Sequence, residues 1–211
     1  MIPRSYPQIP VRTKLGLAPL VAVIFAVYVL GQHGGINLNL DAGPPTTQPA
    51  TRGASSAPAP TRAARADIPA AYLALYRSAA RICPRLEWGV LAGIGKVETD
   101  HGRSSAPGVR FGVNAFGCCA GPMQFNLRNG PPSTWDSYGH GGDPYDPRDA
   151  IPAAAQLLCA NGLTADPPPP DPCPGVLGTA GEHAAVHAYN HACWYVQQVL
   201  SLARRYATER R

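Results

Sequence analysis

A single glutamate near the end of an apolar stretch is the residue of this sequence best suited to acid–base chemistry. The stretch 88–102 reads WGVLAGIGKVETDHG, and within it Leu91, Ile94 and Glu98 are spaced three and four residues apart. A helix places these side chains on one face, so the Glu98 carboxyl lies on the apolar side of the helix, near its C-terminal end. Burial and the negative end of the helix dipole both disfavour a charged carboxylate. The spacing therefore predicts the raised pKa that a general acid needs near neutral pH.

The end of this helix decides which other groups can reach Glu98. Gly102 is suited to be the left-handed residue that stops the helix. Asp100 is the nearest second carboxylate, but residues two apart point to different faces of a helix. The alternative for Glu98 is a helix-end side chain that turns back to solvent, and the stretch by itself leaves both interpretations open.

The charge distribution argues against a nucleic-acid partner. The chain has 211 residues and a formal net charge of +5. The excess comes from residues 1–14, with three positive charges, and from residues 32–66, with a net charge of +2. Residues 67–211 hold twelve basic and twelve acidic side chains and are therefore balanced. A basic surface on the folded part, which nucleic-acid binding requires, is not expected.

The N-terminal segments predict export to the outside of a membrane. Residues 1–14 form a positive cytoplasmic tail, and the uncharged run LGLAPLVAVIFAVYVL begins the segment 15–31. This run is long for a signal-peptide core and short for a membrane span. We favour a single-pass membrane anchor, because no A-x-A cleavage site follows. The alternative is a signal segment removed after Gly31, which releases a secreted protein.

Residues 32–66 predict a linker, since they are rich in Pro, Ala, Thr and Gly and cannot bury enough apolar area to fold. The folded domain is then 67–211. Its first helix is expected to be capped by Asp67, with Pro69 in the first turn. A later helix begins at Asp146, with Pro147 at its first position, and two more span about 180–190 and 193–207. No strand pattern of useful length occurs, so the domain is predicted to be all-α, with long irregular loops.

Six cysteines lie in this exported part and predict a disulfide framework. The sequence does not separate the 15 pairings that six cysteines allow. The preferred single pair is Cys159–Cys173, which closes a proline-rich loop of about 15 residues and stabilises the fold by roughly 3 kcal/mol. A zinc site is the alternative, but no CxxC spacing supports it.

Three histidines four residues apart could also suggest a metal. His183, His187 and His191 share one helix face if the helix continues, but EHAAVH is not HExxH, and the helix is expected to end near residues 189–190. Surface histidines are therefore favoured, and neither a metal nor another cofactor is expected. Trp135 is equally suited to stacking on a sugar and to anchoring its loop.

Five blocks of sequence occur in an order that resembles a known family. They are WGVLAGIGKVETDHGRS, GPMQF, a downstream TW, DPYDPRDAIPAAAQLL and HAYNHACWYVQQVL. Together they look like the catalytic domain of the lytic murein transglycosylases, lysozyme-like enzymes of the bacterial cell wall, over residues 67–207. The loop between Gly102 and Gly121, with its adjacent cysteines, and the proline-rich loop 162–178 depart from the family pattern.

The resemblance implies a site and a substrate. Glu98 matches the catalytic acid, and Thr99 stands where the family usually has Ser. Gln124, with its neighbours Met123 and Phe125 in GPMQF, matches the motif that lines the saccharide cleft. Tyr189 and Asn190 match the motif that closes over the carboxylate and the sugar. The implied substrate is a peptidoglycan glycan strand, and the implied protein is a monomer with a lysozyme-like fold.

Glycoside hydrolysis normally uses two carboxylates. Since Asp100 is on the wrong face, candidates for a second one are Asp136, Asp143 and Asp146. The family mechanism needs only Glu98, which protonates the bond between N-acetylmuramic acid and N-acetylglucosamine and then takes a proton from the C6 hydroxyl, giving a 1,6-anhydro product. The alternatives are a hydrolytic muramidase on the same scaffold, a non-catalytic peptidoglycan-binding domain, and a phage-tail or secretion-apparatus lysin.

Overall fold

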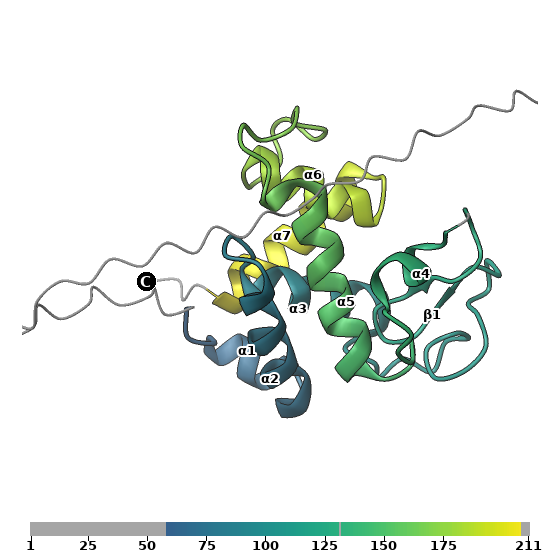
Figure 1. Cartoon of the computed structure of the whole chain (residues 1–211). Helices are drawn as coiled ribbons and strands as arrows, with labels where there is room; N and C mark the ends of the chain where they lie inside the picture. The colour runs from purple at the N-terminus through teal and green to yellow at the C-terminus, as the bar shows by residue number, and fades with distance from the viewer. Residues whose placement is uncertain (1–57, 131, 208–211) are drawn as a thin grey trace, which may run out of the picture. The chain divides into compact units, whose positions relative to one another are not determined.

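A computed structural model describes residues 58–130 and 132–207, and this part is mainly helical, as predicted (Figure 1). The predicted tail 1–14, the segment 15–31 and residues 32–57 of the predicted linker lie outside the described residues. Within the described part, no helix is long and apolar enough to cross a bilayer. The α-helices are α1 Arg62–Asp67, α2 Ala70–Ala79, α3 Trp88–Thr99, α4 Thr134–Tyr138, α5 Pro147–Leu158, α6 Ala180–Tyr189 and α7 Cys193–Ala207.

Short irregular elements complete the chain. A 3₁₀ turn, Ala80–Ile82, follows α2, and a π turn, Cys159–Leu163, follows α5. The strands β1 Cys119–Ala120 and β2 Phe125–Asn126 pair antiparallel, with Ala120 opposite Phe125. In Figure 1, β1 and α4 lie on one side of α5, and α1 and α2 lie on the other.

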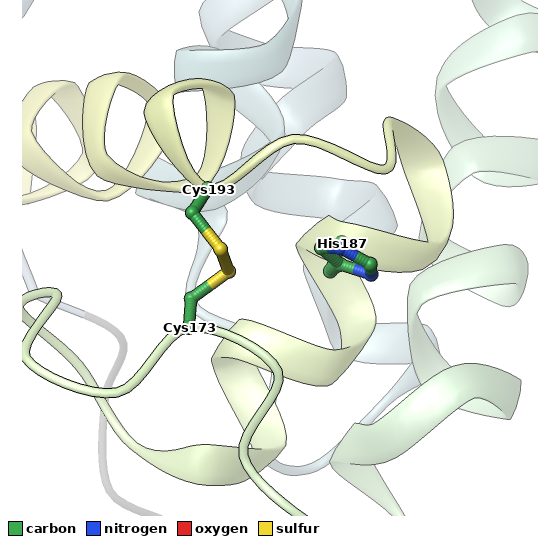
Figure 2. A group of neighbouring side chains, drawn as sticks. All are labelled: Cys173, His187 and Cys193. Atoms are coloured by element: carbon green, nitrogen blue, oxygen red, sulfur yellow. A yellow bond between two sulfur atoms is a disulfide. The ribbon is translucent and has the colours of Figure 1, made fainter.

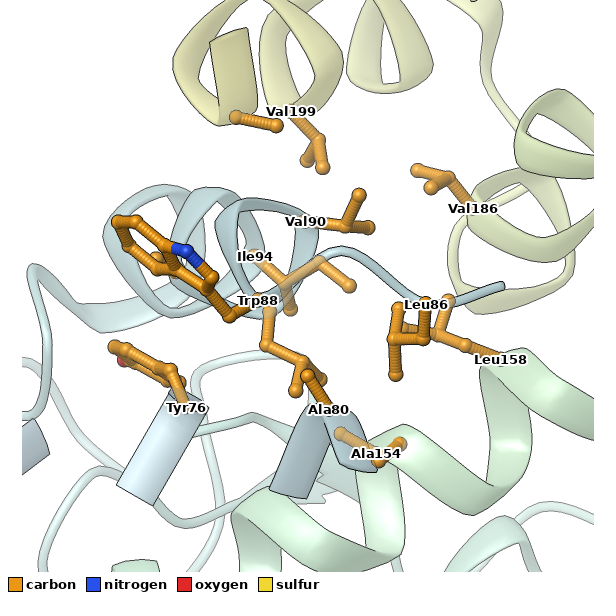
Figure 3. Packing of buried hydrophobic residues seen from close by; sticks show 14 of the residues in the cluster. Tyr76, Ala80, Leu86, Trp88, Val90, Ile94, Ala154, Leu158, Val186 and Val199 are labelled. Carbon is orange, nitrogen blue, oxygen red and sulfur yellow. The ribbon is translucent and has the colours of Figure 1, made fainter. Parts of the chain in front are cut away.

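The helix that carries Glu98 is the centre of the core. Every residue of α3 from Trp88 to Gly95 is buried, as expected for a helix that is apolar on all sides. Figure 3 shows its side chains between Tyr76 of α2, Leu158 of α5 and Val199 of α7. Each fully buried large side chain of this kind contributes about 1.5–3 kcal/mol to folding. The element that positions the acid is thus the most enclosed one described.

Two glycines let α7 approach α3 closely. A Cβ atom on Gly89 would lie 2.7 Å from the carbonyl oxygen of Ala203, and one on Gly93 would lie 2.6 Å from that of Val199. Real Cβ atoms essentially never come this close to backbone atoms. The contacts also fix the direction of the pair, because residue numbers rise along α3 while they fall along α7. The first turn of α7 is thereby brought to the last turn of α3.

The predicted helix starts are right for α5 and α6 and wrong for the first helices. Asp146 caps α5 by accepting a hydrogen bond from the backbone N–H of Arg148, and Pro147 is the first helical residue. The chain, however, is already helical from Arg62, inside the predicted linker, with Thr61 as its N-cap. Asp67 is the last residue of α1 and does not cap α2, which has no side-chain cap. The composition of residues 62–67 did not reveal α1, because alanine and arginine are common in linkers as well as in helices.

The cysteines pair differently from the preferred pair Cys159–Cys173. The structure joins Cys83 to Cys159, Cys118 to Cys119, and Cys173 to Cys193, with no free cysteine in the described part. The predicted closure of the proline-rich loop by Cys159 and Cys173 is therefore wrong. The end of α5 packs against the turn after α2, so Cys159 meets Cys83, which is 76 positions away in sequence.

Candidate active site

Glu98 lies in the last turn of α3, and its carboxyl meets the first turn of α7. Tyr195 Oη donates a hydrogen bond of 2.6 Å to Glu98 Oε1. Glu98 is only partly exposed, and burial raises its pKa from the usual 4.5 to about 7, although the hydrogen bond from Tyr195 acts in the opposite direction. The carboxyl therefore titrates near neutral pH, as the helical spacing predicts.

The turn after Glu98 differs in one detail from the prediction. The left-handed cap of α3 is Asp100, with φ 52°, and His101 and Gly102 also have positive φ. Three such residues in succession reverse the chain at once. Asp100 consequently faces Lys96 and Arg103, at 2.7 Å from each, and these cations hold the pKa of its carboxyl well below the usual range. It makes no second carboxylate for Glu98.

A cluster of charged groups holds this end of α3 against both ends of the domain. Lys96 Nζ lies 2.7 Å from Asp67 Oδ1, Arg103 lies 3.2 Å from the same oxygen, and Tyr206 Oη donates to Asp67 Oδ2 at 2.6 Å. Burial opposes ionisation of Asp67, but these donors outweigh it and lower its pKa to about 2. The last turn of α3 is thereby tied to α1 and α7.

Thr99, Met123 and Phe125 are not placed to contact substrate, contrary to the expectation. All three side chains are buried. Thr99 Oγ1 donates a 2.6 Å hydrogen bond to the carbonyl of Pro122 and accepts one from the N–H of Gly102. Phe125 packs edge-on against Trp135, at 5.2 Å between ring centroids. These residues instead fix the position of the segment 121–125 beside the end of α3.

Gln124, in contrast, is partly exposed, between two buried neighbours. Its backbone has φ 50°, a strained value for a residue other than glycine. Its side chain donates to the carbonyl of Gly121 at 2.9 Å and accepts from Asn114 Nδ2 at 3.2 Å. The tight turn and these bonds present Gln124 in one orientation.

Tyr189 is the last residue of α6, and Asn190 is the C-cap of that helix. Tyr189 Oη donates to the carbonyl of Met123 at 2.6 Å, and its ring lies edge-on to Phe125. Burial raises the pKa of Tyr189, and the nearby charge of Glu98 adds to this effect. Asn190 caps the helix through its backbone N–H and has a partly exposed side chain. Tyr189 therefore joins the GPMQF segment to the neighbourhood of Glu98.

Tyr195 is the site residue that the sequence reasoning missed. The available signal was its position one turn before Val199 on the buried face of α7, which faces α3. A buried tyrosine needs a partner for its hydroxyl, and Glu98 supplies it.

The other aspartates considered as second carboxylates are used locally. Asp136 forms a capping box with Ser133, and Asp143 accepts from the backbone N–H of Tyr145. Asp146 caps α5 and pairs with Arg148 at 2.7 Å. Trp135 packs on Phe125 and against Gly139, which favours loop anchoring over sugar stacking. No carboxylate in residues 58–130 and 132–207 contributes to the pKa of Glu98.

The histidines do not form the predicted surface row. His183 is buried, and its Nδ1 lies 2.7 Å from Asp171 Oδ1. His187 lies beside Cys173 and Cys193, and their potential ligand atoms are within 4.8 Å of one another (Figure 2). The two sulfurs, however, are bonded as a disulfide. Zinc binds thiolates, so this group holds no metal in its oxidised form.

A cavity of about 530 Å³ lies elsewhere, at the start of α6, where Arg85, Arg204 and Glu182 are among its lining residues. None of the residues predicted to bind substrate lines it.

Comparisons with protein-family models, with curated proteins and with solved structures find no match for this chain.

Proposed function

We propose that this chain is a peptidoglycan lytic transglycosylase with a lysozyme-like helical domain. It cleaves the β-1,4 bond between N-acetylmuramic acid and N-acetylglucosamine. The observation that carries the proposal is Glu98, a partly exposed carboxyl with a pKa of about 7 and a tyrosine hydroxyl 2.6 Å away. At neutral pH such a group is protonated in a large fraction of molecules and can also hold a charge, so it can serve as acid and then as base.

The reaction uses Glu98 twice and consumes no water. Glu98 donates its proton to the bridging oxygen, and the bond from C1 of N-acetylmuramic acid to that oxygen breaks. The 2-acetamido group of the sugar assists departure. Ionised Glu98 then takes the proton of the C6 hydroxyl as O6 bonds to C1. The product is a 1,6-anhydro sugar, and Glu98 ends protonated as it began.

Tyr195 supports the ionised state between these two steps. Its hydroxyl donates to Oε1, and the hydrogen bond lowers the pKa of Glu98 against the effect of burial. Oε2 has no hydrogen-bond partner among the described residues and is the oxygen assigned to proton transfer. A charge-assisted hydrogen bond of this kind is worth about 1.5–3 kcal/mol.

The isolation of Glu98 favours the transglycosylase over the hydrolase. Retaining and inverting hydrolases normally use a second carboxylate as nucleophile or base. Asp100 faces two cations, and the other candidates cap helices or bond to loop backbone. With one carboxylate available, the substrate's own acetamido and hydroxyl groups complete the chemistry.

The proposed setting is the outer side of a membrane, with residues 15–31 as a single-pass anchor and the catalytic domain reaching the wall as a monomer. The three disulfides support an oxidising compartment. No metal or other cofactor enters the reaction.

Mass spectrometry of products tests the proposal. Purified peptidoglycan is digested with the full chain, with Glu98→Gln, and with Asp100→Asn as a matched control two residues away. We expect 1,6-anhydro muropeptides from the wild type and from Asp100→Asn, and none from Glu98→Gln. Products one water heavier would identify a hydrolase. Strands that are bound but not cleaved by the wild type would identify a binding domain.

A further inference from the structure

The loop 104–119 exposes two phenylalanine rings almost completely. Phe111 is 82% exposed and Phe116 is 90% exposed. Between residues 104 and 121, Arg110 is the only charged side chain. Large apolar side chains that a fold leaves almost fully exposed are candidates for a binding surface. The loop is also one of the two loops in which the sequence departs from the family pattern.

The two rings are held out by a loop that is fixed at several points. Asn114 Oδ1 accepts hydrogen bonds from the backbone N–H groups of Phe116, Cys118 and Cys119, at 3.2–3.4 Å. Tyr145 Oη donates to the carbonyl of Gly112 at 2.5 Å. The disulfide Cys118–Cys119 adds a covalent constraint at the end of the loop. Binding to such a loop costs little ordering entropy.

Both ends of the loop are attached to the candidate active site. At its start, the N–H of Ser104 donates to the carbonyl of Thr99, next to Glu98, at 2.9 Å. Near its end, Asn114 Nδ2 donates to Gln124 Oε1 at 3.2 Å. Since Asn114 also fixes the backbone at Phe116, the exposed ring and Gln124 are positioned by one side chain. The loop that carries the exposed rings is thus attached to the GPMQF segment.

A small cavity at this loop has a positively charged residue, Arg110, in its lining. Residues 104–108, Arg110 and Phe111 line a hollow of about 280 Å³. Arg110 is exposed and makes no ion pair with the residues that the structure describes. A guanidinium beside an aromatic ring suits a carboxylate carried on a partly apolar body.

We propose that the loop 104–119 is a second saccharide-binding surface in addition to the site at Glu98, in which Phe111 and Phe116 lie against the apolar faces of sugar rings and Arg110 pairs with the carboxylate borne by N-acetylmuramic acid or its stem peptide. The inference rests on the proposed function and adds what selects the substrate: a muramic strand is preferred to a chitin strand of equal length. An anionic membrane is the other surface that exposed aromatics fit. A single arginine argues against it, because such surfaces attract clusters of cations.

Binding measurements on the full chain carrying Glu98→Gln separate the two parts of this inference. The ligands are uncrosslinked peptidoglycan glycan strands and chitin oligosaccharides of matched length. Phe111→Ala and Phe116→Ala should each weaken binding of both ligands by roughly tenfold, since each ring loses partial burial in the complex. Arg110→Gln should weaken only the muramic strand. Leu177→Ala, which removes another exposed apolar side chain from a different loop, is the matched control and should change neither.

Three results would overturn the inference. Phenylalanine variants that bind both ligands as the Leu177 variant does remove the stacking surface, and an arginine variant that affects both ligands equally removes the carboxylate contact. Binding to vesicles of anionic phospholipid that depends on the phenylalanines, without an effect on glycan, would assign the loop to a membrane and also refute it. If the parent binds strands while the wild type releases no products, the transglycosylase proposal fails and the binding surface stands.

Discussion

Tyr195 Oη and Glu98 Oε1 lie 2.6 Å apart, although 97 positions separate the two residues in sequence. The contact joins the last turn of α3 to the first turn of α7. Among the described residues, Glu98 is the only carboxyl with a pKa near 7, and this contact gives it one hydrogen-bond donor. Acid strength at this site is therefore the balance of two effects, burial and one hydrogen bond.

Removing that donor should shift the pH dependence of the reaction. In Tyr195→Phe the hydrogen bond that favours ionised Glu98 is lost, so the pKa of Glu98 rises above its present value of about 7. We expect muropeptide release to fall by about 10–100-fold, from the loss of a hydrogen bond to a charged group. The alkaline limb of the pH–rate profile should move to higher pH. A slower enzyme with an unmoved alkaline limb would mean that Tyr195 acts only by packing.

Glu98→Gln should be inactive and yet more stable than the wild type at pH 8. The pKa of Glu98 is raised by folding, so its contribution to stability is present below pH 4.5 and is lost as the pH rises to about 7. Above pH 7 the fold carries a partly buried charge that glutamine removes. The gain in free energy of unfolding should be on the order of 1–2 kcal/mol after allowance for partial exposure. Chemical denaturation at pH 8 and pH 5 measures it, and an equal gain at both values would contradict the assignment.

Low pH should destabilise the fold through His101, whereas protonation of Glu98 stabilises it. Burial lowers the pKa of His101 from 6.5 to about 4, because its ring lies in the core with Nδ1 3.1 Å from Tyr76 Oη. Its neutral form is favoured by folding, so stability is lost as the pH falls from 6.5 towards 4. In the wild type, protonation of Glu98 offsets this loss over nearly the same range. Glu98→Gln should therefore lose stability more steeply than the wild type between pH 6.5 and pH 4.5, as followed by urea unfolding.

Thr99 should matter through its hydroxyl and not through contact with sugar. Thr99→Val keeps the shape but leaves the carbonyl of Pro122 and the N–H of Gly102 without their partner. We expect a loss of about 1–3 kcal/mol in the free energy of unfolding, together with reduced muropeptide release. Thr99→Ser keeps both hydrogen bonds and should retain most of the activity. If the valine and serine variants behave alike, the hydroxyl does not hold the segment 121–125.

The three disulfides should contribute unequally to stability. On the chain-entropy model, closing the loop between Cys83 and Cys159, 76 positions apart, stabilises by roughly 4–5 kcal/mol, and closing that between Cys173 and Cys193, 20 positions apart, by roughly 3 kcal/mol. Paired alanine substitutions measured by urea unfolding should follow this order. The disulfide between Cys118 and Cys119 joins adjacent residues and closes no loop, so the double variant Cys118→Ala, Cys119→Ala is the internal control. An order that reverses the first two pairs would show that packing outweighs chain entropy here.

Local patterns in the sequence predicted the elements that position the acid. The spacing of Leu91, Ile94 and Glu98 predicted the helix α3, and the sequence Asp146-Pro147 predicted the start of α5. The raised pKa of Glu98 followed from the same spacing, because burial is its main cause. These features depend on neighbours within a few residues, and the sequence contains them directly.

Contacts between distant segments were not predictable in this way. The pairing of Cys83 with Cys159 depends on how α2 meets α5, and the hydrogen bond of Tyr195 depends on the register of α7 against α3. Met123 and Phe125 were expected to bind substrate because of their place in a motif, but tertiary packing buries both. A motif marks a segment of the site, and only the fold decides which of its side chains remain exposed.

The close contact of α3 with α7 has a consequence for anyone who engineers this protein. Replacing a helical glycine with alanine usually stabilises a helix by about 1 kcal/mol. At Gly89 or Gly93 the added methyl group would instead meet the backbone of α7 and displace it, and Tyr195 lies in the first turn of that helix. In a mutational scan selected for activity, these two positions should score as intolerant as Glu98. The positions that tolerate no substitution would then include the contact between α3 and α7, where neither glycine touches a substrate.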